Sequence, residues 1–265
     1  MPIVDKPVSR FAAMIADFDE TIKGQGFPAA SHKILQELTG PVVSDGVENI
    51  PLTGPLILAS NHPGTYDGLA IISQLPRDDF RLIVSDVPFF KNLPNAGKNL
   101  IFATHDVSDR MAVIRKCVRH LQDGGALLIF PSGRLDPDPS VFSDAADGLK
   151  KWSRSLEVFM SKVPEVNLVV IIASGILSKN FLNNPLLKFY KDDHEKRRLM
   201  EFIQIINQMV LGKPLELTPK VSFSMPLEKH MENKNRGRIQ QLIIQEKANQ
   251  LLAHHINLYY PLAVN

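Results

Sequence analysis

The chain has little of what would stabilise it covalently or carry it across a membrane. Its 265 residues include a single cysteine, Cys117, so no disulfide can form within it. A lone thiol is typical of a protein from a reducing compartment. The most apolar run, Leu168–Ala173, is strand-sized and falls far short of the about 18 residues that a membrane-spanning helix needs. We therefore expect neither a disulfide framework nor a transmembrane segment.

A strong excess of charge of either sign is also missing. The net charge is +2 and the isoelectric point is near 8.6, which is too weakly basic to indicate a nucleic-acid partner. The first residues, Met1–Lys6, lack the basic start and apolar core of a secretory signal. We expect a cytoplasmic protein without a nucleic-acid partner, and peripheral contact with the cytoplasmic membrane face stays open.

The apolar pattern divides the chain into a helical start and an α/β remainder. Apolar side chains three and four residues apart predict an N-terminal helical pair within residues 1–41. From Val42 onward, short apolar runs alternate with helical periodicity, which indicates a mostly parallel or mixed central sheet flanked by helices. No stretch has the composition of a linker, so we expect one domain over residues 1–265, with 42–265 as its α/β core. Helices are expected near 9–24, 31–38, 66–75, 109–122, 144–161, 192–210 and 236–257, and strands near 42–48, 55–59, 80–84, 99–103, 125–130, 167–173 and 219–224.

A polar turn, Ser60-Asn61-His62-Pro63-Gly64-Thr65-Tyr66-Asp67, follows one of the expected strands. It joins a strand to a helix, and α/β proteins place ligands and chemistry at such junctions. A histidine followed five positions later by an aspartate suits a general base, His62, whose tautomer is fixed by a carboxylate, Asp67. The alternative is structural: Thr65 caps the helix, Asp67 complements the helix dipole and His62 is an ordinary turn residue.

A second apolar run, Ala126–Phe130, also leads into a turn, Pro131-Ser132-Gly133-Arg134. A guanidinium at the end of a strand can bind phosphate or carboxylate through paired hydrogen bonds. The alternative is a structural ion pair from Arg134 to Asp136 or Asp138. The turn thus predicts either an anion site or a salt bridge.

Together the two turns resemble conserved blocks of the glycerolipid acyltransferases, the family of glycerol-3-phosphate and lysophosphatidic acid acyltransferases. Residues Asn61–Asp67 match the family's NHxxxxD block, and Phe130–Arg134 resembles its FPEGTR block. Between them, Gly97–His105 is similar to the GxxFIxR segment, and Val169–Ala173 resembles the apolar strand that follows. The resemblance covers roughly residues 42–180.

The resemblance implies transfer of a fatty acyl group from a thioester to a hydroxyl of a glycerolipid- or lysophospholipid-type acceptor. His62 would deprotonate this hydroxyl and Asp67 would orient the imidazole. Acyl-CoA or acyl carrier protein would be the co-substrate, with no cofactor and no metal. The substrate-binding positions expected from the matched blocks and their neighbourhood are Asn61, Gly64, Thr65, His105, Arg110, Phe130, Pro131, Ser132, Gly133 and Arg134.

Four positions depart from the family pattern, and at one of them, near Ala173-Ser174, the usual proline of the fourth block is replaced. Ser132 stands where the family has glutamate, Arg134 lies one place early, and His105 takes the place of an arginine, with Arg110 nearby. In the family these last three positions help to bind the phosphate of the acceptor. The departures leave open a different lipid or polyol acceptor.

Other functions are open from the sequence alone. Ser60 and Ser132 beside a His/Asp pair could serve a lipid esterase, although the chain has no GxSxG elbow. A non-catalytic lipid or acyl-carrier binder could keep the same fold. Cys117 and His120 lie one helical turn apart, but their apolar neighbours favour a packed helix over a thiol nucleophile.

Two segments and one histidine pair carry weaker signals. Residues 89–91 and 181–191 combine apolar side chains with lysines, which is typical either of membrane contact or of a helix that covers a sheet. For 181–191 we favour the covering role. His254 and His255 are adjacent on a helix and do not face the same point, so we expect a solvated or packed pair and no metal site.

Overall fold

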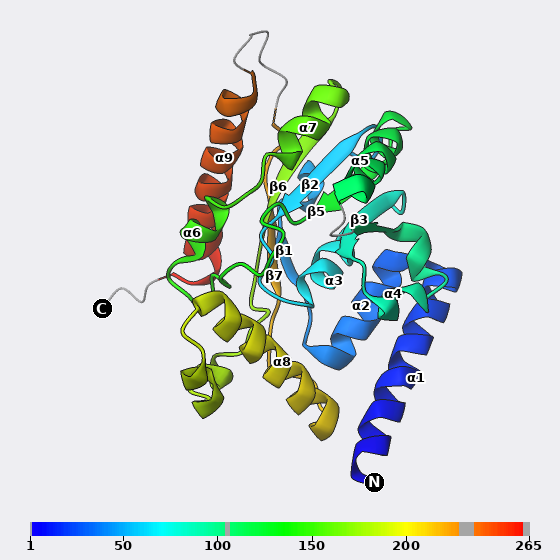
Figure 1. The fold of residues 1–265 in the computed structure, drawn as a ribbon, viewed down its shortest axis with the longest axis vertical. Coiled ribbons are helices and arrows are strands. Elements are labelled where there is room, and N and C mark those ends of the chain that lie inside the picture. Colours follow the sequence, from blue (N-terminus) through cyan, green and yellow to red (C-terminus); the bar gives the residue numbers. More distant parts are fainter. Residues whose placement is uncertain (1, 104–106, 228–235, 262–265) are drawn as a thin grey trace.

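A seven-stranded mixed sheet forms the centre of the computed structural model, which describes residues 2–103, 107–227 and 236–261 (Figure 1). The strand order is β1-β7-β6-β2-β5-β3-β4, and the five strands from β6 to β4 are parallel to their neighbours. The pair β1 and β7 runs the opposite way, because β7 is antiparallel to β6. The bounds are β1 (Val43–Asp45), β2 (Leu56–Ser60), β3 (Phe80–Ser85), β4 (Leu100–Ala103), β5 (Ala126–Ile129), β6 (Asn167–Ser174) and β7 (Lys220–Phe223).

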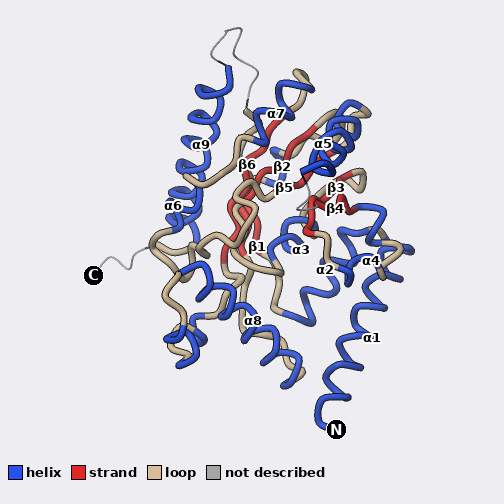
Figure 2. Tube along the Cα trace, viewed as in Figure 1, coloured by secondary structure: helices blue, strands red, loops and turns tan. Residues whose placement is uncertain are grey.

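Helices cover both faces of this sheet (Figure 2). One face packs against α1 (Pro2–Gln25), α2 (Phe27–Leu38) and α3 (Asp67–Ile72), with α8 (Asp193–Leu211) beside α1. The other face packs against α5 (Val107–Gln122), α6 (Ala145–Leu149), α7 (Ser155–Lys162) and α9 (Arg236–Tyr259). A short helix, α4 (Pro88–Lys91), follows β3. The predicted fold class and the N-terminal helical pair are confirmed.

Alternate residues of the central strands enter two different cores. In β2, Leu56 and Leu58 pack on the α1–α3 side, whereas Ile57 and Ala59 pack on the α5–α9 side. Successive side chains of a strand point to opposite faces, so a strand that is covered on both sides is apolar throughout. The unbroken apolar runs of the sequence are explained by this double cover, and the parallel strands bring their carboxyl ends to one edge of the sheet.

The single helix predicted over 144–161 is wrong, because the chain forms α6 and α7 with a break between them. Trp152 turns into the core on the α5–α9 side, and the amide of Ser153 donates to the carbonyl of Pro131 at 2.9 Å. This bond ties the break to the turn after β5. Apolar periodicity continued across the break, so the sequence pattern did not reveal it.

The covering role expected for residues 181–191 is also wrong. The segment lies in two 3-10 turns, η3 (Lys179–Phe181) and η4 (Pro185–Phe189), and of its large apolar side chains only Leu187 is buried. Phe189 is 81% exposed and Leu186 is 50% exposed. The assignment of the whole chain to one domain remains a prediction.

Candidate functional site

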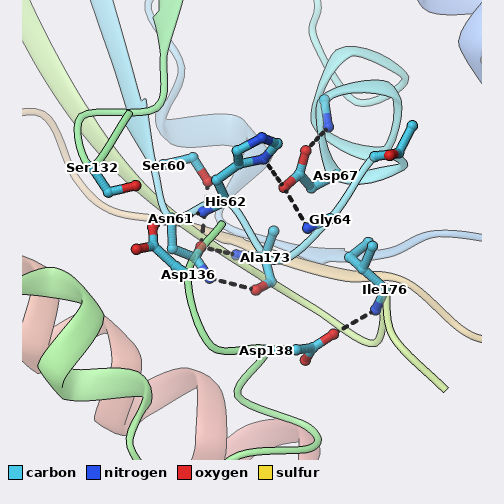
Figure 3. A network of polar contacts seen from close by, with 12 residues as sticks. Ser60, Asn61, His62, Gly64, Asp67, Ser132, Asp136, Asp138, Ala173 and Ile176 are labelled. Carbon is cyan, nitrogen blue, oxygen red and sulfur yellow. Dashed lines mark hydrogen bonds and ion pairs between the residues drawn. The ribbon is translucent and has the colours of Figure 1, made fainter. Parts of the chain in front are cut away.

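His62 and Asp67 meet at the carboxyl-terminal edge of the parallel strands. β2 ends at Ser60, and the buried residues Pro63 and Gly64 lead the chain into α3, which begins at Asp67. The imidazole Nδ1 lies 2.7 Å from the Oδ2 of Asp67 (Figure 3). The turn therefore folds back far enough for the two side chains to pair directly.

The Asp67 carboxylate is fixed by its surroundings as well as by His62. Its side chain is 1% exposed. Oδ2 also accepts the amide of Gly64 at 3.2 Å, and Oδ1 accepts the amide of Gly68 at 2.5 Å. Its position at the first residue of α3 places the negative charge at the positive end of the helix. The carboxylate is thus held as an acceptor aimed at the imidazole.

The imidazole is held on one face and open at its far edge. It stacks on the Phe130 ring, with the centroids 4.3 Å apart and the planes 22° from parallel. Because a carboxylate can only accept, neutral His62 carries its proton on Nδ1 and keeps a lone pair on Nε2. The His62 side chain is 28% exposed, so a ligand can reach the ring.

The charges around His62 favour its protonated form. Burial opposes protonation, but the nearby carboxylates of Asp67, Glu201 and Asp136 outweigh it and raise the pKa of His62 above its ordinary value. Asp67 acts through both its charge and its hydrogen bond. An imidazole with a raised pKa accepts a proton more readily, as a general base requires.

Asn61 has a structural role, and its predicted substrate contact remains a prediction. Its amide nitrogen donates to the carbonyl of Ala173 at 2.9 Å, and its amide oxygen accepts from the Ala173 N–H at 2.8 Å. The side chain is buried and extends the pairing of β2 with β6 beyond the last backbone bond (Figure 3). These two bonds therefore fix the position at which the chain leaves β2, just before His62.

Two aspartates after β5 hold the edge of the site together. Asp136 pairs with the backbone of His62, accepting its N–H at 3.0 Å and donating its own N–H to the carbonyl at 2.7 Å. Burial raises the pKa of the Asp136 carboxyl, although the His62 N–H bond opposes this. Asp138 is fully buried and accepts from the amides of Gly175, Ile176 and Leu177 after β6. From the sequence, both aspartates were expected only as ion-pair partners of Arg134.

Glu201 of α8 is a site residue that the sequence analysis missed. Its carboxylate accepts from both the backbone N–H and the hydroxyl of Thr65, the latter at 2.5 Å. Thr65 therefore does not cap α3, and the capping alternative is wrong. Burial, the largest cause, and the charge of Asp67 raise the pKa of Glu201. Because Glu201 lies 136 positions away on an expected helix, no local pattern pointed to it.

Of the other predicted substrate-binding residues, those that the structure describes are spread along the same edge. Ser132 donates to the carbonyl of Arg134 at 2.7 Å, and the residues Gly133 and Arg134 are exposed. Within the described residues Arg134 forms no ion pair, so the predicted bridge to Asp136 or Asp138 is not made. Pro131 is buried. The remaining two are Arg110, exposed in the first turns of α5, and His105, which lies outside the described residues.

None of the three alternative nucleophiles is aligned with a base. Cys117 is buried in the core on the α5–α9 side, and burial raises its pKa to about 12. The nearby His120 uses its Nε2 on the carbonyl of Ala126. The Ser60 hydroxyl is fully buried and lies 3.4 Å from the Asn61 amide oxygen. In the described part of the chain, no serine hydroxyl bonds to His62.

The adjacent histidines of α9 belong to two different environments. His255 is fully buried between the hydroxyls of Ser174 and Ser222, at 2.6 and 2.8 Å, and burial lowers its pKa to about 3. His254 is exposed and lies 2.9 Å from Asp45. The two side chains point to different partners, and no cluster of metal ligands occurs among the residues that the structure describes.

Two comparisons with known proteins find a similarity to acyltransferases. A family model described as Acyltransferase matches residues 41–181. Among solved structures, the 1-acyl-sn-glycerophosphate (LPA) acyltransferase PlsC from Thermotoga maritima is similar over 95% of this chain and 87% of its own, with a TM-score of 0.50 and 14% sequence identity. At this identity the similarity concerns the fold. A search of curated proteins finds no match.

Proposed function

The chain belongs to the acyltransferase family, and we propose that it moves a fatty acyl group from a thioester to a hydroxyl of a glycerolipid- or lysophospholipid-type acceptor. The donor is acyl-CoA or acyl carrier protein. The family model covers the His62–Asp67 turn and the turn after β5. The observation that carries the proposal is the 2.7 Å contact between the His62 Nδ1 and the buried Asp67 carboxylate.

In the proposed mechanism, His62 acts as a general base through Nε2. Asp67 holds the proton on Nδ1, so the Nε2 lone pair is available to the acceptor hydroxyl. As the hydroxyl oxygen bonds to the thioester carbonyl carbon, its proton passes to Nε2. The Asp67 carboxylate stabilises the imidazolium that results.

Collapse of the tetrahedral intermediate completes the reaction. The carbon–sulfur bond breaks, the imidazolium returns its proton to the departing thiolate, and the products are an ester and a free thiol. No acyl-enzyme is formed. General-base assistance of this kind contributes about 10²–10⁴-fold in rate, so positioning of the two substrates supplies much of the remainder.

The proposed class of acceptor is wider than the glycerol phosphates. Arg134 is exposed at the edge of the site, but Ser132 holds the backbone of this turn where the family has a glutamate. Arg110 lies in the first turn of α5, which follows β4, and β4 is three strands away from β2 in the sheet. The Arg134 guanidinium can thus bind a phosphate at this edge, but the glutamate and arginine positions of the family pattern are not reproduced.

We place the protein in the cytoplasm, in contact with the cytoplasmic membrane face when it acts. Of the described helices, none has both the length and the apolar character to cross a bilayer. Because the acyl chains of acceptor and product lie in membranes, a peripheral enzyme can reach the acceptor in the membrane and the acyl donor from the cytoplasm.

Release of free thiol from long-chain acyl-CoA or acyl carrier protein tests the proposal. Thiol release should require an acceptor, and an esterified lipid should accumulate in equal amount. Release of thiol and fatty acid without any acceptor would instead indicate an esterase. Binding of acyl donor without thiol release, across lysophospholipid, glycerol phosphate and neutral acceptors, would indicate a non-catalytic binder.

A further inference from the structure

In its second half, helix α8 buries polar side chains and exposes large apolar ones. Its buried residues are Arg197, Met200, Gln204 and Gln208, of which three are polar or charged. On the opposite side, Phe202 and Val210 are each 60% exposed and Ile206 is 42% exposed. These three residues are four positions apart, so they form a single stripe along the helix. An amphipathic helix of a water-facing protein has the reverse arrangement.

The inner face is attached to the site by hydrogen bonds. Gln204 donates to the carbonyl of Ile176 at 2.9 Å and accepts the amide of Ser178 at 2.8 Å. Gln208 accepts the hydroxyl of Tyr66, and Glu201 accepts from Thr65. Tyr66 and Thr65 belong to the turn that carries His62 and Asp67. The outer stripe therefore lies on the far side of a helix that forms one wall of the site.

Further exposed apolar residues lie at the N-terminal end of α8, beyond the exposed ion pair of Arg198 with Glu195. From Phe202 to Leu211 the helix has no charged side chain. At its N-terminal end α8 contacts η3 and η4, where Leu186, Phe189 and Tyr190 are exposed. At its C-terminal end α8 contacts α1, and Figure 1 shows α8 (yellow) at the lower edge between these elements. We call Phe202, Ile206 and Val210 with Leu186, Phe189 and Tyr190 the apolar rim.

The charge beside the apolar rim is positive on balance, because the start of α8 adds three acidic residues, Asp192, Asp193 and Glu195, and three basic ones, Lys196, Arg197 and Arg198. Residues 178–191 contain three lysines, all exposed, and no acidic residue. A second copy docked face to face through this surface would bring these lysines together, whereas anionic lipid headgroups would neutralise them. Exposed apolar side chains bordered by lysines are typical of a surface that enters the boundary between headgroups and acyl chains.

We infer that the apolar rim is the surface by which the protein docks on an anionic lipid bilayer, with α8 lying along the interface. This inference rests on the proposed function only in that a lipid acceptor gives the protein a reason to bind a membrane. In this orientation the inner face of α8 holds the His62–Asp67 turn directly above the lipid, so an acceptor hydroxyl has a short path to Nε2. Residues 181–191 contribute to docking and not to the cover of the sheet.

The test is sedimentation of the full chain with vesicles of phosphatidylcholine alone and with equal parts of phosphatidylglycerol. Wild type should bind the mixed vesicles more strongly, and added salt should weaken the binding. Phe202→Glu with Val210→Glu should lower the partition coefficient at least about tenfold. The matched control is Leu242→Glu with Leu258→Glu on α9, which adds the same charge at residues that are 58% and 47% exposed. Once the general repulsion caused by the added negative charge is subtracted, the partition coefficient of this variant should stay near the wild-type value.

Three outcomes would overturn the inference. They are equal loss of binding in both double variants, no binding of wild type to either vesicle, and a dimer in analytical ultracentrifugation that only the α8 variant dissociates. Binding is measured without turnover, so vesicle binding in the absence of any thiol release would reject the proposed function and leave the docking surface intact. Thiol release without vesicle binding would reject the docking surface and leave the proposed function intact.

Discussion

Glu201 accepts two hydrogen bonds from Thr65, three positions after His62, and so joins α8 to the turn that carries the proposed base. Gly64 lies against the same contact, since a Cβ at this glycine would come within 3.1 Å of the Glu201 Oε1. The carboxylate thus shapes the turn and also adds negative charge near the imidazole. It is a positioning residue for His62.

Glu201→Gln separates these two effects. The amide oxygen can still accept from Thr65, but the negative charge that helps to raise the pKa of His62 is lost. Because His62 acts as a base only when neutral, activity rises as pH increases through its pKa. The midpoint of the acidic limb of kcat/KM should therefore move to lower pH, with kcat on the plateau little changed. The control is Glu195→Gln on the same helix; an unmoved limb in Glu201→Gln would contradict the electrostatic role.

Asp67→Asn should abolish most of the activity without unfolding the protein. An asparagine amide can donate to Nδ1, which places the imidazole proton on Nε2 and removes the lone pair that takes the acceptor's proton. We expect a fall in kcat of about 10²-fold or more, with circular dichroism unchanged. Asp86→Asn, an exposed carboxylate paired with Lys91, should have wild-type activity. Retention of full activity by Asp67→Asn would show that the carboxylate does not orient the base.

Asp138→Ala should destabilise the fold more than it alters the chemistry. The buried carboxylate accepts the amides of Gly175, Ile176 and Leu177 and both polar groups of Ser140. Leaving these donors without their acceptor should lower the free energy of unfolding by about 3 kcal/mol or more, measured by urea denaturation. Asp147→Ala, a surface carboxylate paired with Lys150, should show no measurable change. Equal stability of the two variants would remove the anchoring role of Asp138.

The exposed Arg134 bears on acceptor choice. If its guanidinium meets the phosphate of an acceptor, Arg134→Ala should raise KM at least about tenfold for a phosphorylated acceptor and leave KM for an uncharged acceptor unchanged. The comparison variant is Arg154→Ala, at the start of α7 and paired with Glu157. A uniform change across acceptors would mean that Arg134 stabilises the turn and does not recognise the phosphate.

Local patterns were enough to predict the sheet and the central pair. The apolar runs at β2, β5 and β6 are long and bounded by breakers, so each strand was located to within a few residues. The contact of His62 with Asp67 could be expected because a strand-to-helix turn reverses the chain within five positions. These features depend on residues that are close together in sequence.

Features that depend on distant residues could not be predicted. Asn61 meets Ala173, and Glu201 meets Thr65, across more than a hundred positions. The break between α6 and α7 arises where Ser153 bonds to Pro131, which no periodicity records. The polar inner face of α8 is invisible to a pattern that assigns apolar residues to the inside. Tertiary contacts decide each of these outcomes.

The role of His62 is tested most directly by thiol release from acyl-CoA in the presence of a lysophospholipid, with wild type beside His62→Ala. We predict that wild type releases thiol only with acceptor. His62→Ala should lower kcat about 10²–10⁴-fold, while its urea denaturation midpoint and its acyl-CoA affinity change little. Full acceptor-dependent activity in a folded His62→Ala would show that His62 is not the general base, whichever acceptor is used.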